Sequence, residues 1–156
     1  MNDLKLSNLE VGAYHGKRRV VALDAATYAP SSGESGTIFA FDGTACSVAL
    51  PAAEVGVEYF FVVHTTQTGD AVITTESADK MSGGFLKATA AFNNTNLGAT
   101  TTVLDSLPAT TDTLTLNGTT TGGVIGSYLH VVGMAANKWH VSGNVIGSGT
   151  MVTSAS

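Results

Sequence analysis

The four histidines, His15, His64, His130 and His140, are the side chains of this sequence best suited to metal binding or proton transfer. No two of them stand at a metal-ligand spacing such as HxH or HExxH, and the single cysteine provides no thiolate pair. If the segments around His130 and His140 form a hairpin, the two rings could face each other and, with an acid, hold zinc or a proton. We instead expect both to be polar members of a half-exposed hairpin, or residues of a subunit interface.

Motifs for nucleophilic, acid–base and phosphate chemistry are missing from the sequence. There is no G-x-S-x-G elbow, and the acids Glu54 and Glu58 flank one corner without an evident third group. The glycine pairs Gly83-Gly84 and Gly122-Gly123 neither follow a strand nor open a helix, so neither predicts a phosphate cradle. We therefore expect no catalytic residue, no metal, no cofactor and no enzymatic activity. A cupin-like enzyme or small hydrolase that uses the histidines is the least favoured alternative.

The length and charge of the chain limit the classes of protein to which it can belong. Its 156 residues fit one domain, and its net charge of −5 at pH 7 argues against a nucleic-acid partner. No apolar run approaches the roughly 20 residues that span a bilayer, and the start MNDLKLSNLE shows no signal peptide. We expect synthesis in a cytoplasm and no membrane partner. Only 12% of the residues are charged, which suits a surface covered by other proteins.

Cys46 and Trp139 are the only residues of their types. Cys46 stands among apolar neighbours in ACSVAL, so we expect a small buried thiol; an intersubunit disulfide and a nucleophile are the alternatives. Trp139 follows a short turn, where a tryptophan commonly anchors a hairpin in the core. Its alternative role is to stack on a sugar from an exposed loop.

Short strands are the elements that must position these residues. Apolar runs recur between turn formers at a spacing of about 8–12 residues, and no long helical pattern interrupts them. The pattern predicts an all-β fold, a jelly-roll-like sandwich or small barrel of about 8–10 short antiparallel strands. The expected strands are Arg19–Leu23, Thr37–Phe41, Thr44–Leu50, Glu58–His64, Ala71–Thr75, Phe85–Phe92, Thr100–Leu104, Thr113–Leu116, Ser127–Met134 and Lys138–Ser142, with a last edge at Val145-Ile146.

Turn residues and composition predict the connections and the boundaries of the domain. The pairs Asp42-Gly43 and Asn117-Gly118 are typical of two-residue hairpin loops, and Pro108 is expected to end a strand. We expect an N-terminal arm over residues 1–18, a single β domain over 19–146 and a flexible C-terminal tail over 147–156.

The run Tyr59–Val63 is too apolar for a strand with one face in water. Such a strand should alternate apolar and polar residues, whereas five apolar residues follow one another here. We expect both of its faces to be covered, one by the core and the other by a second chain. The partner contact is then made by Tyr59, Phe61 and Val63, or by the opposite set, Phe60 and Val62.

The N-terminal arm supplies the remaining candidates for a partner contact. The basic run Lys17-Arg18-Arg19 lies where the arm meets the first strand, and it is too short to bind nucleic acid by itself. It is either a solvated cluster or a clamp that holds the arm against an acidic partner surface, because arginine pairs well with carboxylates. Tyr14 precedes it in the arm. Our candidate interface residues are thus Tyr14, Lys17, Arg18, Arg19, Tyr59, Phe61 and Val63.

The order of these features resembles the small all-β proteins of tailed bacteriophages. The similarity is to head decoration (cement) proteins and to related β modules of tail fibres, with a pattern of the type VTLPA…G…F.V and a last hairpin of the type G….V….WYV.G. The matching positions are Val48–Ala52, Gly56–Val63, Asp70–Thr75 and Gly126–Gly143, the last containing Trp139. The resemblance extends from about residue 19 to residue 143.

The resemblance implies a structural role in a virion. A decoration protein of this kind is expected to bind the outside of the capsid as a homotrimer and to bridge neighbouring copies of the major capsid protein. The alternative implied by the same resemblance is a tail-fibre or spike module that binds a host receptor or glycan. That alternative needs exposed aromatic side chains, for which Trp139, Tyr128 and Tyr14 are the available platforms.

Overall fold

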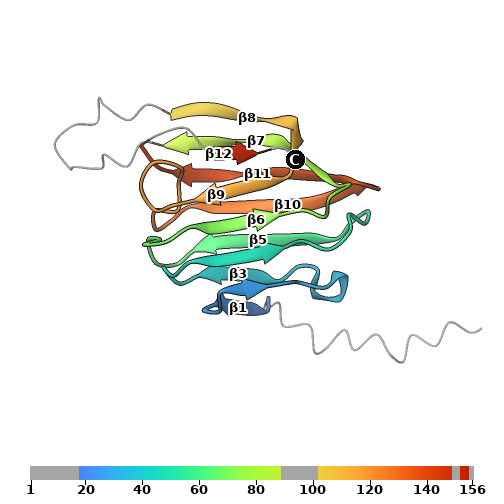
Figure 1. Ribbon diagram of the computed structural model, residues 1–156, viewed down its shortest axis with the longest axis horizontal. Coiled ribbons are helices and arrows are strands. Elements are labelled where there is room, and N and C mark those ends of the chain that lie inside the picture. Colours follow the sequence, from blue (N-terminus) through green and yellow to red (C-terminus); the bar gives the residue numbers. More distant parts are fainter. Residues whose placement is uncertain (1–17, 89–101, 149–151, 155–156) are drawn as a thin grey trace, which may run out of the picture.

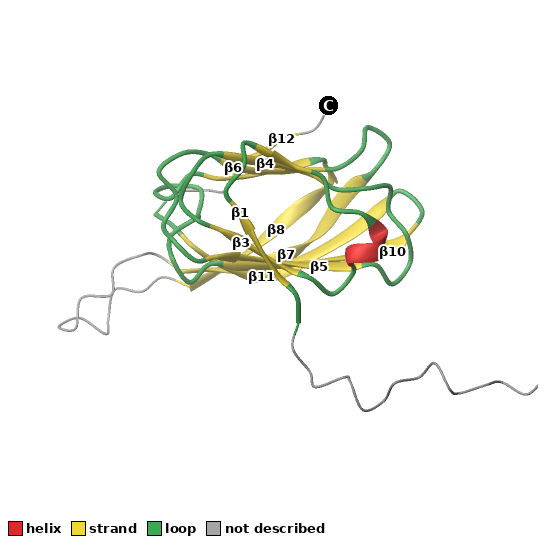
Figure 2. Cartoon of the chain, turned by 90° about the horizontal axis from the view of Figure 1, so that it is seen from below, coloured by secondary structure: helices red, strands yellow, loops and turns green. Residues whose placement is uncertain are grey.

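The computed structural model of the protein describes residues 18–88, 102–148 and 152–154. Its strands form two sheets that pack face to face, as the view in Figure 2 shows. The only helix among the described residues is one short 3-10 turn, Ser32–Glu34. The prediction of an all-β sandwich is therefore confirmed.

The larger sheet has seven strands in the order β1-β3-β5-β10-β11-β7-β8 and extends across the whole molecule (Figure 1). Strand β1 lies at one edge and β8 at the other. The strands are β1 (Val20–Leu23), β3 (Ile38–Phe41), β5 (Glu58–Val63), β10 (Tyr128–Ala135), β11 (Lys138–Ile146), β7 (Lys80–Ala88) and β8 (Thr102–Thr111).

The smaller sheet has five strands in the order β12-β9-β6-β4-β2. Its edge strands are short, three residues in β12 and two in β2. The strands are β12 (Val152–Ser154), β9 (Thr113–Leu116), β6 (Ala71–Thr74), β4 (Cys46–Ala49) and β2 (Thr27–Tyr28).

The first six strands alternate between the two sheets, so this half of the chain winds as a flattened coil. Strands β1, β3 and β5 are parallel neighbours in the larger sheet, and β2, β4 and β6 are parallel neighbours in the smaller one. Of the ten strand pairs in the described residues, five are parallel and five antiparallel. The prediction of antiparallel pairing throughout was wrong.

The turn at Asp42-Gly43 shows why the strand pairing was predicted wrongly. Asp42-Gly43 was expected to close a hairpin, but it joins β3 to β4, which belong to different sheets. Gly43 has φ 103°, and the Asp42 carboxylate accepts hydrogen bonds from the backbone and hydroxyl of Thr44. These residues set the local reversal of the chain, but they do not determine which sheet the next strand enters.

Three other predictions about the strands are corrected. The described residues contain twelve strands rather than eight to ten, because β2 and β12 are too short to show a pattern. Strand β12 lies within the tail that was expected to be flexible, and it pairs with β9. Pro108 lies inside β8 rather than ending it, since an edge strand tolerates a residue without an N–H donor.

The predicted pairing of the last two long strands is confirmed. Strands β10 and β11 are antiparallel neighbours, with Val131 opposite Val141. Asn137 in the connecting turn has φ 61°, a left-handed conformation that asparagine adopts more readily than most residues. Trp139 is fully buried on β11, as expected of a hairpin anchor.

Strand β5 directs alternate side chains to the core. Tyr59, Phe61 and Val63 are at most 2% exposed, so they pack between the sheets and are not available to a partner. The Phe61 ring stacks on Phe39 with centroids 5.5 Å apart, and the ring of Tyr59 lies 5.9 Å from that of Trp139. The prediction that Tyr59, Phe61 and Val63 form a partner interface was wrong, and the opposite set points outward.

The hydroxyl of Tyr59 is held as a neutral donor within this core. It donates a hydrogen bond of 2.8 Å to the backbone carbonyl of Ser31. Burial, together with the nearby charges of Glu34 and Glu54, raises the pKa of Tyr59 to about 12. The hydroxyl therefore stays protonated across the physiological range and ties the loop before the 3-10 turn to the core.

Cys46 is a buried thiol, as the sequence predicts, and it should not react in the native protein. It is 2% exposed on β4, and burial raises its pKa, with smaller contributions from Asp42 and Asp24. We expect a thiol reagent such as DTNB to modify Cys46 in the native protein on the order of a hundredfold more slowly than in the urea-unfolded protein. Fast stoichiometric labelling of the native protein would contradict this burial.

Candidate interaction surface

The outer faces of the two sheets differ in chemistry. On the smaller sheet the residues that alternate with the core are mainly small and polar, whereas on half of the larger sheet they are apolar. We call this apolar half the outer patch. The outer face of the smaller sheet consists of Ser47, Thr74, Thr113 and Thr115, with Ala49 and Val72 as its apolar members. The outer patch consists of Val20, Ala22, Ile38, Ala40, Phe60, Val62, Tyr128 and Val132.

Strand register brings the outer patch together from four strands. Val20 lies opposite Ile38, Ile38 opposite Phe60, and Phe60 opposite His130. A second row runs beside it. In this row Ala22, Ala40, Val62 and Tyr128 are the successive partners. The patch is therefore a continuous surface over β1, β3, β5 and β10, although its residues are far apart in the sequence.

Part of the outer patch is open to solvent. Val20 is 62% exposed and Tyr128 is 48% exposed. Ile38, Phe60 and Val62 are half-buried, because neighbouring side chains of the sheet shield part of their surface. A contiguous apolar face of this kind is uncommon on a protein that works alone, so we take it as the candidate interaction surface.

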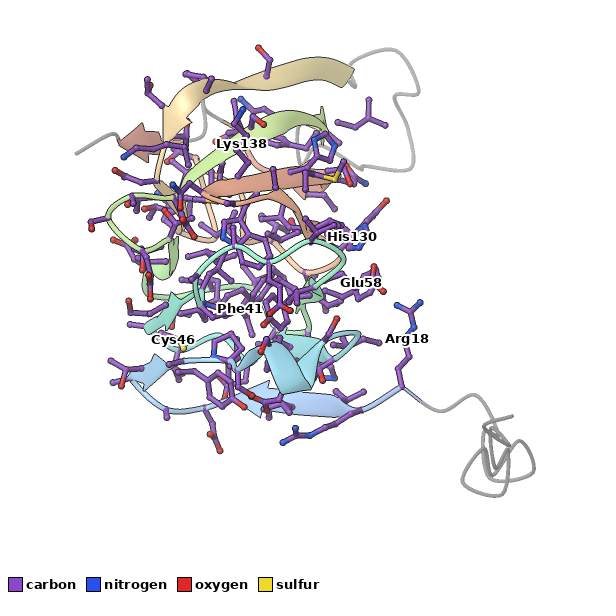
Figure 3. The ribbon with its side chains drawn as sticks, turned by 90° about the vertical axis from the view of Figure 1, so that its right-hand side faces the viewer. Arg18, Phe41, Cys46, Glu58, His130 and Lys138 are labelled. Atoms are coloured by element: carbon purple, nitrogen blue, oxygen red, sulfur yellow. The ribbon has the colours of Figure 1, made fainter. Side chains whose placement is uncertain are left out.

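A small charged cluster is built around Phe60, and we call it the Phe60 cluster. The His130 ring stacks on the Phe60 ring with centroids 4.2 Å apart and planes at 3°. The His130 Nε2 atom lies 2.7 Å from the Glu58 carboxylate. On β1's side, the guanidinium of Arg18 lies 4.2 Å from the centre of the Phe60 ring. Figure 3 shows that Arg18, Glu58 and His130 gather on one side of the molecule.

The Phe60 cluster holds its ring in one orientation. Two planar groups, each about 4.2 Å from the same ring, cannot share one of its faces, so Arg18 and His130 enclose Phe60 from opposite faces. A cation over an aromatic face contributes about 0.5–2 kcal/mol, depending on exposure. The cluster therefore presents a fixed aromatic edge beside the apolar rows, which lowers the entropy cost of covering it.

The two histidines of the last hairpin share the outer face, but they are not opposite each other. His130 lies across from Ser142, and His140 lies across from Val132. His140 is exposed beside the polar half of the sheet, whereas His130 belongs to the Phe60 cluster. Among the described residues, no group of three or more His, Cys, Asp or Glu side chains is arranged to hold a metal ion.

Arg19 pairs with an acid of its own chain. Its guanidinium lies 2.8 Å from a carboxylate oxygen of Glu34, which also accepts a hydrogen bond from the hydroxyl of Tyr28. The other oxygen of Glu34 accepts hydrogen bonds from the backbone and side chain of Ser31. Of the basic run, Arg18 therefore remains beside the outer patch, while Tyr14 and Lys17 lie outside the described residues.

Glu34 should make the stability of the protein sensitive to acid. The hydrogen bonds from Ser31 and Tyr28, with the charge of Arg19, lower its pKa below the ordinary value of 4.5. Because the folded form holds the carboxylate ionised, its contribution is full above about pH 4.5 and is lost as the pH falls through the lowered pKa.

We expect Glu34→Gln to destabilise the protein by about 1–2 kcal/mol at pH 7 and by little at pH 3. Thermal unfolding at the two pH values measures this difference. The exposed Glu76 provides a matched control, since its Gln variant should behave as the wild type at both. An equal loss in Glu34→Gln at pH 3 and pH 7 would contradict the argument.

Residues of the outer patch were only partly predictable. From the sequence, Phe60 and Val62 were named as the alternative set, Glu58 as an acid at one corner, and His130 as a polar member of the last hairpin or of a subunit interface. Tyr128 was named only as a platform for a glycan, and Val20 and Ile38 were missed. The sequence does contain a pattern that could have identified Val20 and Ile38. In the segments RVVAL and TIFAF apolar residues occupy both alternating sets of positions, so each strand has apolar side chains on both of its faces.

Comparison with protein-family models, with curated proteins and with solved structures found no match to this chain. Within the described residues, no helix is long and apolar enough to cross a membrane. The inference about function therefore rests on the fold and on the outer patch.

Proposed function

We propose that this protein is a structural component of an assembly, and that another subunit covers its outer patch. The observation that supports this is the contrast between the two sheets. Val62 on β5 stands between Ala40 and Tyr128, whereas Val72 at the equivalent outer position of β6 stands between Ser47 and Thr115. One face is suited to water and the other to protein.

The outer patch has the composition of the centre of an interface. Stable contacts bury on the order of 800 Å² per partner and have an apolar centre with a polar rim. Here the apolar rows are bordered by Arg18, Glu58 and His140, and by Ser142 on β11. Aromatic and arginine side chains contribute most to such contacts, and the Phe60 cluster contains both.

More specifically, we propose that the protein is a decoration protein of a tailed-phage head. The similarity of sequence pattern supports this identity, together with the low content of charged residues. The protein would act as a homotrimer on the capsid exterior, hold neighbouring copies of the major capsid protein together and require neither a cofactor nor a catalytic residue. A closed symmetric oligomer is the usual arrangement of such subunits.

The burial of Trp139 speaks against the glycan-binding alternative. A receptor- or glycan-binding tail module needs exposed aromatic platforms, and Trp139 is fully buried against Tyr59. Of the platforms expected from the sequence, Tyr128 is exposed, and Tyr14 lies outside the described residues. One aromatic ring on a flat apolar sheet fits a protein contact better than a sugar site.

Counting the protein in purified virions tests the proposed function. Densitometry of stained gels should give on the order of hundreds of copies per particle, because a decoration protein repeats with the capsid lattice. The ratio to the major capsid protein should also be constant between preparations. A handful of copies, or copies that separate with the tail rather than the head, would overturn the proposal.

A further inference from the structure

Strand β1 leaves one edge of the larger sheet unpaired. It pairs with β3 on one side, and no other described strand pairs with its second side (Figure 1). Its sequence, VVAL, contains no proline and no charge. Val20 and Ala22 are exposed there, and Val20 is 62% exposed.

The other three edges of the described sheets carry features that discourage pairing. Strand β8 contains Pro108, which cannot donate a backbone hydrogen bond. Strands β2 and β12 have only two and three residues. Natural proteins protect their edges by such means, so an unprotected apolar edge is unusual.

The register shows which backbone groups of β1 are free. The N–H of Ile38 donates to the carbonyl of Arg19, and Val20 is the residue opposite Ile38. In a parallel pair this pattern turns the backbone groups of Arg19, Val21 and Leu23 toward β3. The N–H and C=O groups of Val20 and Ala22 therefore point away from the sheet.

We propose that β1 pairs in antiparallel fashion with β1 of a second copy of this chain, with Val21 at the two-fold axis. Val20 then lies opposite Ala22 of the partner copy, and Ala22 lies opposite Val20 of the partner copy. The four outward groups of each strand meet those of the other, which gives four backbone hydrogen bonds. The two larger sheets become one continuous sheet, and their outer patches adjoin.

Charge complementarity supports this occupant and this register. With Val21 at the axis, Arg18 lies opposite Asp24 of the partner copy, and the same pair recurs at the other end. Asp24 is exposed and makes no hydrogen bond or ion pair among the described residues. Arg18 is long enough to turn from Phe60 to that carboxylate, which accepts its paired N–H donors.

The contact is two-fold, so it adds to the proposed function rather than restating it. It holds whether or not the protein decorates a capsid. In a trimer whose own contacts leave the β1 edges free, the contact would join one trimer to another. Four hydrogen bonds and a few small side chains make a weak interface alone, which strengthens when several edges engage together.

Sedimentation velocity over a range of concentrations tests the pairing. The wild type should associate in steps of two, as monomer to dimer or as trimer to hexamer. Ala22→Pro removes an outward N–H without touching the bonds to β3, so it should weaken this step by about tenfold or more. Ala22→Ser keeps the N–H and should associate as the wild type does.

A charge exchange tests the register independently of proline. Arg18→Glu and Asp24→Arg should each weaken the two-fold step, and the double variant should restore it, because the pair is then reversed. Circular dichroism confirms that each variant is folded. The proposal is overturned if the wild type shows no step of two, if folded Ala22→Pro associates like the wild type, or if the double variant stays as weak as the single ones.

Discussion

Phe61→Ala is expected to lower the free energy of unfolding by about 3–5 kcal/mol, the largest loss of stability that we predict. Phe61 is 1% exposed at the centre of the core, between Phe39 at 5.5 Å and Phe41 at 6.0 Å. Removing the ring leaves a cavity that these stacked neighbours cannot fill without leaving their own positions. Urea unfolding followed by tryptophan fluorescence measures the loss, since Trp139 is the only tryptophan.

Phe60→Ala is the matched comparison on the same strand. Its ring is half-buried on the outer face, so its removal should cost about 1 kcal/mol, from the lost contacts with Arg18 and His130. Which of the two variants loses more stability depends on which face of β5 packs in the core. Equal losses, or a larger loss for Phe60→Ala, would contradict the assignment of the faces.

Val62→Asp is expected to abolish binding to the partner that we propose for the outer patch, while leaving the fold intact. The side chain points outward between Ala40 and Tyr128, so the free protein can hydrate the new carboxylate. In the assembly the charge is buried without a partner, which costs on the order of 3–5 kcal/mol and a hundredfold or more in affinity. The measurement is the binding of purified variant to heads that lack the protein.

Val72→Asp is the control for this experiment. Val72 is also a half-buried outward valine on a central strand, but it belongs to the polar face of the smaller sheet. It should bind as the wild type does, and both variants should unfold at similar temperatures. Equal affinity of both variants for the particle would show that the outer patch is not the contact.

The sequence predicts the strands of this fold better than their partners. Runs such as Tyr59–Val63 identify a strand because apolar residues cluster between turn formers, and most expected strands are present within a few residues. Pairing is a different matter. The residues around Asp42-Gly43 do not indicate that the next strand enters the other sheet. That choice depends on which apolar faces pack against each other, and those faces come from segments distant in the sequence.

The assignment of faces could not be read from β5 itself. Tyr59 to Val63 are all apolar, so either phase of the strand could face the core, and the sequence excludes neither. The neighbouring strands make the choice. Phe39 and Phe41 on β3 meet Phe61 on the inner side, and together these rings fill the space between the sheets.

The Phe60 cluster is a product of tertiary structure. Arg18, Glu58 and His130 have no spacing in the sequence that suggests contact, and they meet because β1, β5 and β10 adopt one register. A close reading could identify each residue as polar and available. Only the order of the strands shows that two of them enclose the same aromatic ring.

A density map of the intact particle, obtained by electron cryo-microscopy, tests the central claim most directly. The sandwich can be oriented in the map by its two sheets of seven and five strands. We predict that protein density from another subunit covers Phe60, Val62 and Tyr128, and that the threonine-rich outer face of the smaller sheet is exposed to solvent. A particle in which the smaller sheet makes the contact and the outer patch faces solvent would contradict the account.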